Sequence, residues 1–178
     1  MASTSPQLPD NLWQTIQESI PIACVDIVPY RVLADGTAQL GLILRNTPQQ
    51  GRRWCMTGGR LQLDESVSDA LERQLHETFE GGLKHVEPLP QPIIVEFFRE
   101  KRPGFPVDQR QHALSLTHLL EVFDDAPVAH GDEAYDFRWF SRAELDAGPA
   151  STIMGFGQEL LLDRFFAEIS RQQSEAAI

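Results

Sequence analysis

The sequence predicts a single α/β domain in which a mixed β-sheet is packed between helices. Three observations support this fold class. The chain has 178 residues, short alternating apolar strands surround one central amphipathic helix, and a second amphipathic helix closes the chain. A chain of this length buries about two-thirds of its unfolded surface, which is enough for one core. We expect the domain to span residues 9–172, with disordered tails at 1–8 and 173–178.

The first expected element is a short helix over residues 10–19. Asp10 is placed to cap it, because an aspartate at a helix start accepts hydrogen bonds from the first backbone N–H groups. Three apolar residues of this helix are expected in the core, namely Leu12, Trp13 and Ile16.

Alternation of apolar and polar residues predicts the strands. The Asp35-Gly36 pair marks a hairpin turn between the first two strands. Residues 48–53 are expected to form a loop, and a glycine turn follows. The predicted strands cover residues 22–30, 38–46, 93–98, 113–123 and 137–140, and the last helix covers residues 158–171.

The central helix lies between two glycine pairs, within residues 58–83. Ser66 followed by Asp69 resembles a capping box, and Leu63 is placed to pack against the helix as a hydrophobic staple. At about 100° per residue the apolar side chains form one stripe. These side chains are Val67, Ala70, Leu71, Leu75 and Phe79.

Composition excludes several classes of partner. The formal net charge is −11, so a nucleic acid duplex or an anionic membrane surface would be repelled. No apolar run is long enough to predict a membrane-spanning helix. The two cysteines, Cys24 and Cys55, form no CxxC pair, and this is typical of a reduced, cytoplasmic protein.

The central segment also carries the acidic residues of a possible metal site. Glu65 precedes the helix, and Arg73 and Glu77 lie four residues apart, hence on one helix face. Such a loop–helix–loop could hold a divalent cation against a diphosphate. The alternative is an ordinary surface helix whose charged residues are solvated.

This segment resembles the Nudix signature, G-x5-E-x7-R-E-U-x-E-E-x-G-U, in which U is a bulky aliphatic residue. The residues that match in register are Gly59, Glu65, Arg73, Leu75 and Glu77. The sequence departs at Gln74 and Thr78, where the family has glutamates, and at Glu80, where it has glycine. The resemblance implies a Nudix-type α/β/α sandwich.

The Nudix resemblance also implies a bound metal ion, magnesium or manganese. The expected ligands are the carbonyl of Gly59 and the side chain of Glu77, with Glu80 as a further candidate three residues on. Glu65 and Arg73 are carried over as a structural pair that ties the loop to the helix.

Within the Nudix superfamily the sequence is similar to the GDP-mannose mannosyl hydrolase branch. The match rests on GGR-x-Q-x-DE at residues 58–65, on the strand that carries Asp26, and on residues 136–139. The resemblance implies that Asp26, Arg45 and Arg60 lie beside a bound nucleotide sugar. It also implies a homodimer.

The same resemblance suggests candidates for acid–base catalysis. The branch has a catalytic histidine at the position of Ala134, so the expected candidates are Glu133 beside it, His130 upstream, and Asp26. Solvated or structural roles remain alternatives for all three. His118, on an alternating strand, is expected to be a core or cleft residue.

Three functions are therefore considered for this sequence. The first is hydrolysis of a nucleoside diphosphate sugar, which releases the nucleoside diphosphate and the free sugar. The second is Nudix pyrophosphatase chemistry, with water attacking phosphorus. The third is a non-catalytic nucleotide-sugar-binding module. A basic cluster could attract a phosphate or a second subunit, or form a solvated loop; it consists of Arg99, Lys101, Arg102 and Arg110.

Overall fold

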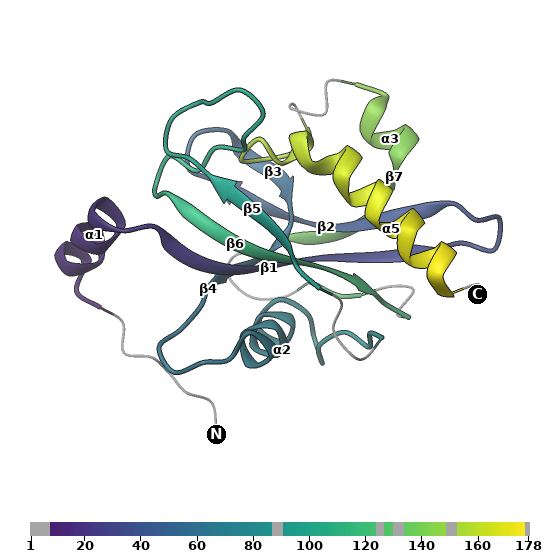
Figure 1. Ribbon diagram of the computed structural model, residues 1–178, viewed down its shortest axis with the longest axis horizontal. Helices are drawn as coiled ribbons and strands as arrows, with labels where there is room; N and C mark the ends of the chain where they lie inside the picture. Colours follow the sequence, from purple (N-terminus) through teal and green to yellow (C-terminus); the bar gives the residue numbers. More distant parts are fainter. Residues whose placement is uncertain (1–7, 87–90, 124–126, 130–133, 149–152, 177–178) are drawn as a thin grey trace.

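A computed structural model of the chain describes residues 8–86, 91–123, 127–129, 134–148 and 153–176. One sheet of seven strands forms the centre of this structure (Figure 1). The elements are α1 (Asp10–Ser19), β1 (Ile22–Val32), β2 (Ala38–Thr47), β3 (Gly51–Cys55), β4 (Thr57–Arg60), α2 (Val67–Thr78), β5 (Ile93–Phe97), β6 (Ala113–Glu121), β7 (Asp136–Ser141), α3 (Arg142–Asp146), the 3-10 helix η1 (Gln158–Leu161) and α5 (Leu162–Ala176).

The sheet is mixed, as predicted. Its strand order is β3-β2-β1-β6-β5, with β4 paired to β1 and β7 paired to β2. Strands β1 and β6 run parallel, and the other pairs are antiparallel. The long strand β1 pairs with β4 through its first half and with β2 through its second half. Its position between three neighbours makes β1 the strand around which the site is built.

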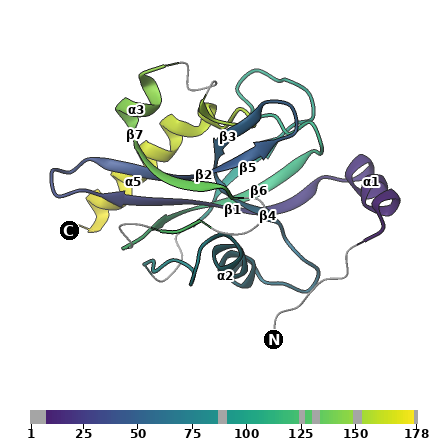
Figure 2. The same cartoon turned by 180° about the vertical axis from the view of Figure 1, so that it is seen from behind.

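Helices cover both faces of the sheet, and this confirms the predicted α/β/α sandwich (Figures 1 and 2). On one face, Leu71 and Leu75 of α2 pack with Val25 of β1. On the other face, Phe165 and Ile169 of α5 join a larger apolar cluster. The predicted stripe of α2 is confirmed at four positions that are fully buried, namely Ala70, Leu71, Leu75 and Phe79. The capping box of Ser66 and Asp69 is also present.

Two predictions for residues 48–60 were wrong. Residues 51–55 form strand β3 rather than part of a loop, and β3 pairs with β2 in a hairpin. The glycine-rich stretch 57–60 is strand β4 rather than a turn. Glycine in a strand often marks a place where another part of the chain approaches the backbone closely, and that is its role here.

The first helix differs from its prediction. Pro9 rather than Asp10 occupies the N-cap position, and no side chain caps the helix. None of its residues is fully buried. Leu12 is 45% exposed, whereas Trp13 and Ile16 are partly buried and pack against the larger core cluster. The helix stands at one end of the sheet instead of covering a face (Figures 1 and 2).

Two further predictions, the Leu63 staple and the end of the last helix, need correction. Leu63 is 86% exposed, so it does not act as a hydrophobic staple. Helix α5 continues to Ala176 instead of fraying after residue 172. In the part of the chain that the structure describes, no helix is long and apolar enough to cross a membrane.

Candidate functional site

Asp26 lies at the centre of the sheet, between β4 and β6. In register it pairs with Gly58 on one side and with Thr117 on the other. A side chain at Gly58 would collide with the carboxylate and the backbone of Asp26, and the φ angle of this glycine is +151°. Gly58 therefore allows β4 to lie directly against the carboxylate of Asp26.

The carboxylate of Asp26 titrates unusually close to neutral pH. Ser115 Oγ donates a hydrogen bond to Oδ2 of Asp26 at 2.6 Å. Burial raises the pKa of Asp26 to about 6, and it prevails over the hydrogen bond from Ser115 and the charge of Arg45, which both lower the pKa. A carboxyl group with such a pKa can donate or accept a proton at physiological pH.

A cleft of about 570 Å³ opens above the glycines of β4. A recess of about 70 Å³ shares part of this lining and reaches Asp26. Three arginines line the cleft, namely Arg45, Arg60 and Arg110. The structure thus brings Asp26, Arg45, Arg60 and Gly59 to one place, as the sequence predicts. The cleft is rich in cationic groups, although the chain carries a net charge of −11.

Arg110 is the cleft residue that sequence reasoning assigned elsewhere. Its Nε and Nη2 donate to Oδ1 and Oδ2 of the buried Asp108 at 2.9 and 2.8 Å. The backbone N–H of Arg110 also donates to Asp108 Oδ1 at 3.1 Å. An aspartate that accepts from the backbone two residues on is a recognisable turn signal. The Asp-x-Arg spacing could therefore have separated Arg110 from the other basic residues of its loop.

Trp13 brings an aromatic ring from α1 to the mouth of the cleft. The guanidinium carbon of Arg60 lies 4.8 Å from the centroid of this ring. Such stacking holds an arginine by a cation–π interaction. Trp13 was expected in the core. It packs against the core in part, and no sequence pattern indicated that its ring would also line a cleft.

Glu65 and Arg73 form the structural pair that the sequence suggested. Arg73 donates from Nε and Nη2 to Oε1 and Oε2 of Glu65, at 2.6 and 2.9 Å. Arg73 Nη2 also donates to the carbonyl oxygen of Arg60 at 3.2 Å. These bonds fix the loop after β4 to helix α2, and so they fix one wall of the cleft.

The predicted metal ligands are not arranged to coordinate a hard cation. The carbonyl oxygen of Gly59 accepts a hydrogen bond from Nε2 of Gln74 at 3.1 Å. Gln74 is buried, and its Oε1 has no hydrogen-bond partner in the described structure. If the amide of Gln74 were reversed, its Oε1 would face the carbonyl oxygen of Gly59, and neither atom could donate. Nε2 is therefore the atom of Gln74 that faces this carbonyl. A cation at this carbonyl would meet the N–H side of the amide.

The two predicted carboxylates do not compensate for this arrangement. Glu77 pairs with Arg73 at 3.0 Å, and its side chain is 60% exposed. Helix α2 ends at Thr78, so Glu80 lies beyond the helix, where its backbone N–H bonds to Val128. Within the described ranges, no group of three or more His, Cys, Asp or Glu side chains could hold a metal ion. As they stand, these residues do not fit magnesium or manganese.

The remaining predicted residues are either buried or outside the described part of the chain. Glu133 and His130 lie outside the described residues. Ala134, at the position of the branch's histidine, is buried, and so is His118. Cys24 and Cys55 are both buried, and neither forms a disulfide. Burial is the largest cause that raises their thiol pKa values, to about 12 and about 11, so neither is a reactive thiolate at neutral pH.

Comparison with known proteins supports the architecture described above. A family model described as Domain of unknown function (DUF4916) matches residues 4–171. No curated protein matches the chain. A possible asymmetric diadenosine tetraphosphate hydrolase from Jonesia denitrificans is 30% identical, with a TM-score of 0.71, and the alignment covers 86% of this chain and 97% of that one.

Two more distant structures share the fold. The NUDIX domain of Shewanella oneidensis NrtR, solved with ADP ribose, is 17% identical with a TM-score of 0.62, over 90% of this chain and 98% of that one. The MutT protein from Methanosarcina mazei Go1 is 16% identical with a TM-score of 0.60, over 84% and 96% of the two chains.

Proposed function

Because this chain belongs to the Nudix superfamily, within the family described as Domain of unknown function (DUF4916), we propose that it binds a nucleoside diphosphate linked to a sugar. The observation that carries the proposal is the convergence of Arg45, Arg60 and Arg110 on one cleft above Asp26. The planar fork of arginine binds phosphate oxygens in pairs, so the forks of Arg45 and Arg60 suit a diphosphate. Arg110, whose Nε and Nη2 are held by Asp108, adds a third cationic group to the same cleft.

The other walls of the cleft suit the two ends of such a ligand. Trp13 offers an aromatic ring against which a nucleobase can stack. Asp26, in the recess, offers a carboxyl group to a sugar hydroxyl. The cleft volume of about 570 Å³ lies within the range of small-molecule sites.

The relatives bind or act on molecules of this kind. The Jonesia denitrificans protein is described as a possible hydrolase of diadenosine tetraphosphate. The NrtR domain was solved with ADP ribose, which is itself a nucleoside diphosphate linked to a sugar. In both ligands a chain of phosphates linked by anhydride bonds joins a nucleoside to a second group.

No metal ion held by the Nudix-like segment, residues 58–83, takes part in this proposal. The carbonyl oxygen of Gly59 already accepts a hydrogen bond from the amide of Gln74, and Glu77 is paired with Arg73. The charge on the diphosphate is instead balanced chiefly by Arg45 and Arg60, because Asp108 already offsets the charge of Arg110. Binding should therefore persist when divalent cations are removed by a chelator.

Hydrolysis is a second candidate function, and Asp26 is the observation that favours it. Its pKa of about 6 leaves a substantial fraction of either protonation state near neutral pH. Asp26 could then take a proton from a water molecule that attacks the anomeric carbon. The products would be a free sugar and a nucleoside diphosphate, whose charge the arginines stabilise.

Calorimetric titration with a panel of nucleotide sugars, in the presence of a chelator, tests the binding proposal. Replacing Arg45 by glutamine should weaken binding about tenfold, because one charge-assisted fork is lost. Arg52→Gln is the matched control, because Arg52 lies on the neighbouring strand β3 and does not line the cleft. Equal affinities for the two variants would reject this cleft as the binding site.

Turnover is tested in water enriched in heavy oxygen. Attack at the anomeric carbon places the label in the free sugar, whereas attack at phosphorus places it in a phosphate. Asp26→Asn should abolish the labelled sugar and leave nucleotide-sugar binding within about threefold, since asparagine retains an acceptor for Ser115. Tight binding without any labelled product would leave the chain as a binding module.

A further inference from the structure

A second cavity, of about 770 Å³, shares Phe156 in its lining with the recess of Asp26. Its lining comes from the loop between β5 and β6, the β2–β3 turn and the start of η1. Backbone hydrogen bonds link the two sides of the loop between β5 and β6. Phe105 N–H donates to Arg102 at 3.2 Å across a Pro103-Gly104 turn, and Asp108 N–H donates to Phe98 at 3.0 Å. Such a turn presents its side chains in fixed positions.

The cavity is lined by three cationic side chains of the predicted basic cluster, Arg99, Lys101 and Arg102. Arg102 lies over the ring of Phe98, 3.8 Å from its centroid. In the part of the chain that the structure describes, Arg99 and Lys101 make no hydrogen bond or ion pair. Cations that gather in an acidic protein without internal partners are suited to an anionic ligand.

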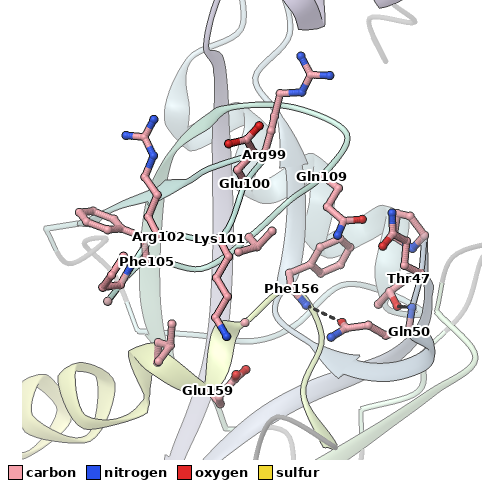
Figure 3. Close-up of a pocket in the computed structure, with 17 residues that line it drawn as sticks. Thr47, Gln50, Arg99, Glu100, Lys101, Arg102, Phe105, Gln109, Phe156 and Glu159 are labelled. Carbon is pink, nitrogen blue, oxygen red and sulfur yellow. Dashed lines mark hydrogen bonds between the residues drawn. The ribbon is translucent and has the colours of Figure 1, made fainter.

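Two aromatic rings flank the same space. Figure 3 shows Phe105 and Phe156 on opposite sides of Lys101, whose side chain extends in the direction of Glu159. Phe156 has a φ of +58°, which is costly for a bulky residue. Its backbone is held there by Gln50 Oε1, 3.2 Å from its N–H, and by Val107 N–H, 2.7 Å from its carbonyl oxygen. The chain thus fixes an aromatic ring at the wall of the cavity.

Glu159 adds an unsatisfied acceptor to this cavity. Its Oε2 is buried and has no hydrogen-bond partner among the described residues. A buried acceptor without a donor is costly, and a bound N–H group would satisfy it.

We propose that this cavity is a second binding site, separate from the arginine-lined cleft, for a purine nucleotide that carries an exocyclic amino group. The phosphates bind Arg99 and Lys101, the base lies against Phe105 and Phe156, and its amino group donates to Glu159. Each of the three observations matches one part of such a ligand. The proposal is independent of what the cleft binds.

Titration of ADP into the full chain by calorimetry tests this site. The chain has two lysines, Lys84 and Lys101, and both are exposed. This gives a matched pair of variants. Lys101→Gln should weaken ADP binding at one site about tenfold, whereas Lys84→Gln should leave it unchanged. Thermal melting of both variants checks that the fold is retained.

Inosine diphosphate tests the amino group, because hypoxanthine presents a carbonyl where adenine presents an amine. It should bind about tenfold more weakly than ADP to the unmodified chain and equally to Glu159→Gln, whose amide can donate. Equal ADP affinities for Lys101→Gln and Lys84→Gln would overturn the site. If Lys101→Gln weakens ADP binding and Arg45→Gln does not, ADP binds in this cavity. That result would support the second site even if the cleft binds no nucleotide sugar.

Discussion

The side-chain amide of Gln74 donates a hydrogen bond to the carbonyl oxygen of Gly59, 3.1 Å away. Gln74 stands at a position where the Nudix signature has a glutamate, and the carbonyl belongs to the glycine that the signature shares. A neutral, buried amide therefore closes the loop onto the helix without a cation. This bond explains how the loop–helix–loop keeps its shape although two signature carboxylates are absent.

Gln74→Glu should convert this closure into a cation site. The new carboxylate would face the Gly59 carbonyl in a buried position, and it would need a cation to stabilise it. We expect the variant to be less stable than the unmodified chain in chelator. Millimolar magnesium should then raise its melting temperature by roughly 2–4 °C.

The control for this gain is Thr78→Glu, which adds a carboxylate on the same helix and leaves the Gln74 bond intact. Its melting temperature should not respond to magnesium. A magnesium response of the unmodified chain equal to that of Gln74→Glu would show that the amide does not exclude the ion.

Gly58 and Gly59 should differ sharply in their tolerance of alanine. A Cβ at Gly58 would collide with the side chain and backbone of Asp26, and nothing lies within 4 Å of a Cβ at Gly59. Gly58→Ala should lower the free energy of unfolding by about 3 kcal/mol or more, and Gly59→Ala by less than about 1 kcal/mol. Urea denaturation measures both, and similar values would contradict the close packing of β4 on Asp26.

Much of the fold could be predicted because it depends on local patterns. The apolar stripe of α2 and its Ser66–Asp69 capping box are encoded within one segment. The errors at residues 51–60 arose because a glycine-rich segment is typical of a turn when its pairing strand is unknown. Only the tertiary structure reveals that Gly58 is needed where β4 meets Asp26 on β1.

The candidate site was predicted in part, through the signature and its neighbours. Arg45 and Asp26 line one recess, and Arg60 lines the adjoining cleft, but their role beside a nucleotide sugar remains a prediction. The closure by Gln74 depends on a bond across 15 residues that no spacing rule contains. Helix α2 ends at Thr78, so Glu80 does not continue the helix that carries Glu77, and its role as a metal ligand remains a prediction. The homodimer and the cytoplasmic location remain predictions.

Arg73→Lys should destabilise the fold through the loop that follows β4. Lysine cannot reproduce the paired bonds to Glu65 together with the bond to the Arg60 carbonyl. We expect a loss of about 1–2 kcal/mol in the free energy of unfolding at pH 7, measured by urea denaturation. Arg171→Lys, in an exposed ion pair of α5, should leave the free energy of unfolding nearly unchanged.

The loss caused by Arg73→Lys should also depend on pH. The hydrogen bond from Arg73 is the main cause that lowers the pKa of Glu65 from its ordinary value of 4.5. A carboxyl group whose pKa is lowered in the folded state contributes stability above pH 4.5. This stability is lost as the pH falls through the pKa of the folded state. The difference between the two proteins should therefore shrink in acid. A constant difference down to pH 2 would mean that the loss comes from packing alone.

Asp26→Asn should change the pH dependence of stability in the opposite sense. The pKa of Asp26 is raised from 3.8 to about 6 in the folded chain, mainly by burial. The folded state then retains a proton that the unfolded state has lost, so the unmodified chain loses stability as the pH rises from 3.8 to 6. Asparagine has no such proton. The variant should therefore gain about 3 kcal/mol relative to the unmodified chain across this window.

Urea denaturation of both proteins from pH 3.5 to pH 8 measures this difference. Asp35→Asn is the matched control, because backbone hydrogen bonding from Thr37 lowers the pKa of that exposed aspartate. Its effect should have the opposite sign and be confined to acid. A difference between Asp26→Asn and the unmodified chain that stays flat from pH 3.5 to pH 8 would show that Asp26 has an ordinary pKa. Its proposed role as the proton acceptor in hydrolysis would then lose its support.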